Sequence, residues 1–109
     1  MAELHLLPAQ ADFVRRALGS HLPRGARVRV FGSRATGHGL KPHSDLDLLI
    51  DSPVELPLAA MANLREALAE SNLPFAVDLL DRVDASAEFL ARLEREGMVD
   101  LSPLATEQA

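Results

Sequence analysis

Two aspartates two residues apart follow a turn of small residues, a spacing that could hold metal ions and phosphate. An apolar run ends in Gly32-Ser33, and eleven residues separate this turn from Asp45-Leu46-Asp47, where a second apolar run begins. Because side chains alternate along a strand, Asp45 and Asp47 should share one face, about 6.6 Å apart. Two carboxylates at that spacing can bracket a pair of divalent cations, and Mg²⁺ prefers carboxylate, water and phosphate oxygens.

The turn itself suits a phosphate group. Gly32 permits a tight turn and a close approach of the backbone, and Ser33 supplies a hydroxyl. The backbone N–H groups that follow could open a short helix, whose start would bind phosphate. Arg34 and Lys41 could add positive charge toward a triphosphate, although flexible loop cations are more often simply solvated.

A third carboxylate is expected from a neighbouring strand, and Asp78 is the best candidate. It lies within the apolar run 75–80, so we expect it to be buried, where an unpaired charge is costly. Asp81 has the opposite parity to Asp78 and should face away. Asp51 shares the parity of Asp47 but lies roughly 13 Å further along its strand.

The helices and strands that hold these residues can be predicted from the spacing of apolar residues and from the residues that start or end helices. Asp84 could cap the last helix and Gly97 could end it. We expect an α/β (α+β) fold, a small mixed sheet covered by helices. The 109 residues form one domain, with its core at about 9–101 and a frayed tail at 102–109. We expect a helical turn after Gly32, helices over 8–22, 58–70 and 84–96, and strands over 26–31, 45–50, 75–80 and 98–101.

Composition excludes several classes of function. The net charge is −5 and basic residues are scattered, so we expect no strong direct binding of nucleic acid. The absence of cysteine excludes disulfides, thiolate metal ligands and a cysteine nucleophile, and is compatible with a reducing cytoplasm. No apolar stretch approaches the roughly 18–20 residues that span a bilayer. The chain starts without a secretory pattern, so we expect cytoplasmic localisation and no membrane partner.

Three short segments resemble a known family: Gly32-Ser33-Arg34-Ala35-Thr36-Gly37, Ser44-Asp45-Leu46-Asp47 and Val77-Asp78-Leu79. They are similar to the minimal nucleotidyltransferases (MNT proteins) of the polymerase-beta-like nucleotidyltransferase superfamily. The characteristic string of that family is Gly-Ser-Arg-Ala-x-Gly, a short loop, and then Ser-Asp-x-Asp. The similarity covers roughly residues 9–101. The loop from Arg34 to Ser44 is one residue longer than a common form.

The resemblance implies a Mg²⁺-dependent nucleotidyltransferase, with two ions and ATP as the donor. It implies Asp45 and Asp47 as metal ligands, Asp78 as the third acidic residue, and Gly32 and Ser33 as triphosphate ligands. It also implies a partner, because many MNT proteins act as the antitoxin of a small helical HEPN protein that resembles an RNase. The implied chemistry is transfer of AMP to a hydroxyl of that toxin, commonly a tyrosine.

Other interpretations of these residues stay open. The fold could neutralise a partner by contact alone, or modify a small molecule or an RNA end with a partner chain supplying the acceptor site. Asp45 and Asp47 could be solvated residues of an edge strand, and Asp78 could hydrogen-bond to backbone. His38 and His43 lie near the expected site, but exposed loop histidines without a metal role are the favoured interpretation.

Overall fold

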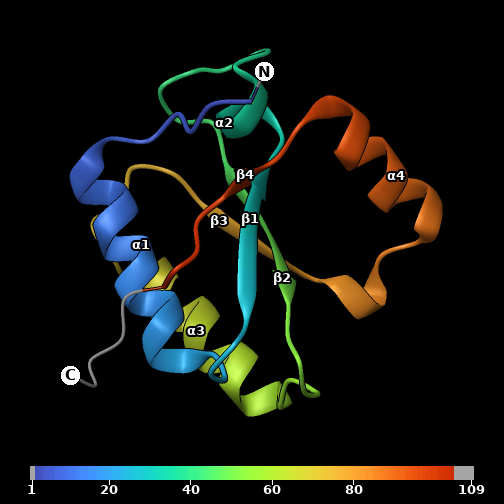
Figure 1. The fold of residues 1–109 in the computed structure, drawn as a ribbon. Coiled ribbons are helices and arrows are strands. Elements are labelled where there is room, and N and C mark those ends of the chain that lie inside the picture. Colours follow the sequence, from blue (N-terminus) through green and yellow to red (C-terminus); the bar gives the residue numbers. More distant parts are fainter. Residues whose placement is uncertain (1, 105–109) are drawn as a thin grey trace.

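A four-stranded mixed sheet lies at the centre of the computed structural model, which describes residues 2–104 (Figure 1). The strand order is β3-β2-β1-β4. β1 is antiparallel to both β2 and β4, whereas β2 and β3 are parallel. This arrangement confirms the expected mixed sheet. The strands are β1 (Arg27–Phe31), β2 (Leu46–Asp51), β3 (Val77–Asp81) and β4 (Val99–Asp100), within two residues of the predicted ranges.

Two helices cover one face of the sheet and contribute to the core. These are α1 (Pro8–His21) and α3 (Leu58–Ala69), whose apolar stripes pack against the inward side chains of β1 and β2. The apolar stripe of α3 is buried at Met61, Leu64 and Leu68. Leu58, the first residue of the helix, is 89% exposed.

The opposite face of the sheet carries α4 (Ala87–Glu96), which Figure 1 shows on the other side of β1 and β2 from α1. The Phe89 ring meets Phe31 edge to face, with 5.9 Å between the ring centroids. Glu94 forms a salt bridge of 3.2 Å with Arg29. Because Phe31 pairs directly with Asp47 in the antiparallel register, the face that α4 partly covers is also the face of the predicted metal ligands.

The start of the last helix differs from the prediction. Asp84 does not cap it, because residues 82–84 form a separate 3₁₀ helix, η1 (Arg82–Asp84), whose first turn is capped by the Asp81 carboxylate. The cap of α4 is Ser86, whose hydroxyl accepts a hydrogen bond from the Phe89 amide. Gly97 ends the helix at φ +105°, as expected.

The chain end that we expected to be frayed begins with residues that contact the core. The Ser102 hydroxyl accepts a hydrogen bond of 3.4 Å from the Val28 amide, and Leu104 packs against the core. Residues 105–109, the rest of that predicted tail, lie outside the described residues. Within residues 2–104, no helix combines the length and the apolar character that crossing a bilayer requires.

Candidate active site

The parallel pairing of β2 with β3 brings two of the predicted acidic residues side by side. Asp47 of β2 lies in register with Asp78 of β3, so the two side chains share a face on adjacent strands. Asp45 stands immediately before β2. On the other side of Asp47 is Phe31, the last residue of β1, and Gly32 follows it directly. Asp47 therefore lies between the third carboxylate and the turn of small residues.

Gly32 is in direct contact with Asp47. A side-chain carbon added at Gly32 would come within 2.6 Å of the Asp47 Oδ2 atom. The backbone at Gly32 also has φ +75°, which side chains other than hydrogen rarely tolerate. Glycine is therefore required at this position for two independent reasons, the left-handed backbone and the close carboxylate. The turn leads at once into the short helix α2 (Ser33–Thr36), as the sequence predicted.

The crowding of negative charge changes the protonation of Asp47. Its pKa rises from 3.8 to about 6, because the carboxyl is partly buried and because the charges of Asp78 and Asp45 oppose its ionisation. A hydrogen bond with Asp78 adds to the rise. The three residues predicted to form the acidic site thus interact in the folded chain. Such a cluster loses its repulsion when a divalent cation binds.

Asp78 is exposed, contrary to the expectation that it would be buried. The physical reason is the place of β3 at the edge of the sheet, where only one neighbouring strand covers it. The apolar run 75–80 contributes just one fully buried residue, Phe75. An exposed carboxylate at an open edge can be reached by a substrate, which a buried one could not.

Arg34 takes a different place from the one predicted. Its side chain is buried, with 6% exposed, and the guanidinium lies 4.1 Å from the centre of the Phe75 ring. The guanidinium donates three hydrogen bonds to backbone carbonyls, those of Ser44, His5 and Pro42, at 2.9, 3.0 and 3.1 Å. Burial lowers the pKa of this group. This geometry favours a structural role, holding the loop before Asp45, over contact with a triphosphate.

A polar cavity of about 610 Å³ adjoins the turn on the side of α4. Its lining combines the start of the chain, the turn, the residues after the turn and the end of α4: Ala2, Gly32, Ser33, Thr36, His38, Arg95 and Glu96. Arg95 was missed by sequence reasoning, because a charged residue in the last turn of an amphipathic helix gives no local sign of what it faces. Lys41 is exposed on the loop and does not line this cavity.

Comparisons with known proteins agree with this geometry. The family model of the nucleotidyltransferase domain matches residues 12–101. The chain belongs to this nucleotidyltransferase family. It is 40% identical over 88 residues to a probable protein adenylyltransferase, MntA, of Haemophilus influenzae, covering 81% of this chain and 75% of that protein. It also resembles a crystal structure of a toxin–antitoxin with AMP-PNP, at a TM-score of 0.65 and 26% identity, covering 87% of this chain and 73% of the other.

The comparisons confirm an MNT-type nucleotidyltransferase with the expected fold. The donor set of this nucleotidyltransferase fits a hard divalent cation, since Asp45, Asp47 and Asp78 offer only carboxylate oxygens. Among residues 2–104, no group of three or more His, Cys, Asp or Glu side chains is arranged so that the protein alone could hold a metal ion. Mg²⁺ commonly takes its remaining ligands from water and substrate phosphates, so an incomplete protein shell suits a metal that arrives with a nucleotide.

The two loop histidines of the nucleotidyltransferase lie at the borders of the site. His38 is exposed and lines the polar cavity. His43 is also exposed, and its Nδ1 atom lies 3.0 Å from the Pro74 carbonyl oxygen, which ties the loop to the residues before β3. The exposed positions of His38 and His43 are compatible with their interpretation as loop residues without a metal role.

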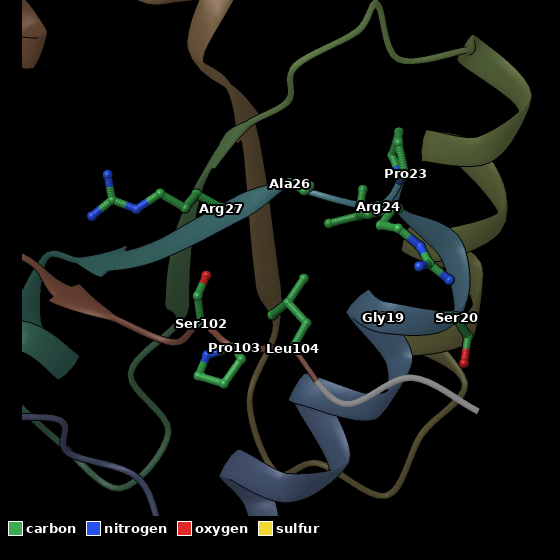
Figure 2. A pocket seen from close by; sticks show the side chains of 11 residues that line it. Gly19, Ser20, Pro23, Arg24, Ala26, Arg27, Ser102, Pro103 and Leu104 are labelled. Atoms are coloured by element: carbon green, nitrogen blue, oxygen red, sulfur yellow. The ribbon is translucent and has the colours of Figure 1, made fainter. Parts of the chain in front are cut away.

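A larger cavity of about 920 Å³ has none of the three acidic residues in its lining (Figure 2). Figure 2 shows it between the end of α1, the start of β1 and residues 102–104. Gly32 follows the opposite end of β1, so this cavity contains none of the residues predicted to bind metal or phosphate.

Proposed function

We propose that this nucleotidyltransferase is a Mg²⁺-dependent protein adenylyltransferase that transfers AMP from ATP to a hydroxyl of a partner protein. The partner proposed is a HEPN-type RNase toxin, and the chain would act as its antitoxin. The observation that carries the proposal is the meeting of Asp45, Asp47 and Asp78 beside Gly32. The relative named a probable protein adenylyltransferase and the toxin–antitoxin structure with AMP-PNP support it.

The residues of the chain define the proposed reaction. The acceptor hydroxyl oxygen attacks the α-phosphorus of ATP, a new P–O ester bond forms, and the bond to the bridging oxygen breaks to release pyrophosphate. Asp78, exposed at the sheet edge, would act as the third metal ligand or as the base that accepts the hydroxyl proton, directly or through water. Asp45 and Asp47 would hold two Mg²⁺ ions, which when bound neutralise phosphate charge and lower the pKa of the acceptor hydroxyl. Gly32 and Ser33 would contact the phosphates through backbone N–H groups and the hydroxyl.

The exposure of Asp78 supports an acceptor brought by another protein. The nucleotidyltransferase domain accounts for residues 12–101. The open edge at β3 leaves Asp78 accessible to a side chain of a docked partner. The lack of cysteine is consistent with the proposed action in the cytoplasm, the compartment of an RNase toxin.

One experiment tests this function. The chain is incubated with a candidate HEPN-type partner protein, Mg²⁺, and ATP labelled on either the α- or the γ-phosphate. We expect label on the partner from α-labelled ATP only, and its loss in the Asp45→Asn/Asp47→Asn variant. Asp51→Asn is the matched control, since it removes one carboxylate from the far end of the same strand and should leave labelling intact.

The outcomes separate the competing interpretations. Binding of the partner without label from any nucleoside triphosphate would contradict the enzyme and favour neutralisation by contact. Label on an RNA or on a small hydroxylated molecule, with none on the partner protein, would retain the chemistry and overturn the acceptor.

A further inference from the structure

The polar cavity beside the turn contains an arginine without a carboxylate partner. Ion pairs occupy its neighbours on α4: Glu94 with Arg29 at 3.2 Å, and Arg92 with Glu96 at 3.5 Å. Within residues 2–104, Arg95 forms no such pair, although the chain carries an excess of acidic residues. An unpaired guanidinium that lines a cavity is available for a ligand of negative charge.

The other cations expected near the turn are not available there. The Arg34 guanidinium already donates hydrogen bonds to three backbone carbonyls. Lys41 is not part of the cavity lining. Arg95 is therefore the arginine that shares a cavity with Gly32 and Ser33. The cavity lining also includes an acidic residue, Glu96, whose charge is offset by its ion pair with Arg92.

The position of the cavity relative to Asp47 indicates which part of a nucleotide it could hold. Gly32 contacts the Asp47 carboxylate and also lines the cavity. The reacting α-phosphate must lie at the acidic residues. The other two phosphates are repelled less by the carboxylates when they extend away from them. The cavity has Arg95, Ser33 and Thr36 in its lining. It therefore offers a positive charge and hydrogen-bond donors in place of carboxylates. Guanidinium groups match phosphate oxygens in a two-point geometry.

We infer that Arg95 binds the β- and γ-phosphates of the nucleotide donor in this cavity. This inference rests on the proposed function, because it assumes a nucleoside triphosphate at the acidic site. Arg95 is then a binding residue that favours a nucleoside triphosphate over a monophosphate. The donor site is formed by α4 as well as by the sheet.

Binding measurements test the inference with three ligands: ATP, AMP and inorganic tripolyphosphate, each titrated calorimetrically in the presence of Mg²⁺. The variant is Arg95→Gln, with Arg95→Lys to retain the charge. The matched control is Arg65→Gln. Arg65 is an exposed arginine on α3, on the other face of the sheet, and forms no ion pair within residues 2–104. Circular dichroism verifies that each variant is folded.

We expect Arg95→Gln to weaken ATP and tripolyphosphate by about tenfold, the scale of one charge-assisted contact, with AMP unchanged. Arg95→Lys should recover part of this loss, and Arg65→Gln should match the wild type. Equal affinity of wild type and Arg95→Gln for ATP and tripolyphosphate would overturn the inference while leaving the proposed function intact. A wild type that binds none of the three ligands would overturn both.

Discussion

Replacing Asp47 by asparagine should stabilise the protein in the absence of metal and abolish its response to Mg²⁺. Asn is nearly the same size and keeps a polar oxygen next to Gly32, but it carries no charge. The pKa of Asp47 is raised from 3.8 to about 6, so the folded state disfavours the ionised carboxyl. The contribution of Asp47 to stability is therefore full below about pH 4, falls as the pH rises to about 6, and is lost above that.

The magnitude follows from the size of the pKa change. At about 1.36 kcal/mol for each pH unit, a rise from 3.8 to about 6 corresponds to at most about 3 kcal/mol. The side chain is only partly buried, and water screens its interactions with Asp45 and Asp78, so we expect about 1 kcal/mol. For a domain of this length, that free energy would raise the melting temperature by about 4 °C.

Thermal unfolding of wild type and Asp47→Asn at pH 4 and pH 7.5, with EDTA or with Mg²⁺, measures both effects. The two proteins should melt together at pH 4, and the variant should melt higher at pH 7.5 in EDTA. Mg²⁺ should raise the melting temperature of the wild type only. Asp51→Asn is the matched control, because Asp51 lies at the end of the same strand and only pairs weakly with Arg82 at 3.8 Å. An Asp47→Asn variant less stable than wild type at pH 7.5, or still responsive to Mg²⁺, would refute the reasoning.

Three further predictions test the surroundings of the site. Gly32→Ala should lower the free energy of unfolding by about 2 kcal/mol, because it combines φ +75° with a clash against Asp47; an unchanged urea midpoint would contradict this. Arg34→Met should cost about 3 kcal/mol in the same urea assay, since three carbonyls lose their donor, whereas an effect on ATP affinity alone would show that Arg34 binds phosphate. Chelation of divalent cations should abolish AMP transfer, and added Mg²⁺ should restore it; transfer that persists in EDTA would exclude a metal-dependent reaction.

Most of the secondary structure could be predicted from local patterns. The periods of apolar residues in α1, α3 and β1 gave their positions within two residues, because each element buries one face. The start of α4 could not be placed in this way. Asp81, Asp84 and Ser86 all have side chains that can cap a helix, and only the path of the chain after β3 decides that Ser86 caps α4.

Local sequence patterns were enough to predict the chemistry of the candidate site. The types and spacing of Gly32, Ser33, Asp45 and Asp47 were enough to predict a turn next to paired carboxylates, since strand alternation and glycine conformation are local properties. The nucleotidyltransferase family followed from the same short segments and was confirmed by the comparisons.

Which residues from distant parts of the sequence lie beside the turn and the paired carboxylates depends on the tertiary structure. The register of β2 against β3 sets Asp78 opposite Asp47, and the place of β3 at the sheet edge exposes it. The packing of the loop encloses Arg34, although its sequence position suggested a phosphate ligand. The crossing of α4 over the second face brings Arg95 to the turn from more than sixty residues away. Long-range contacts depend on how whole elements pack, and no local pattern of residue types records that packing.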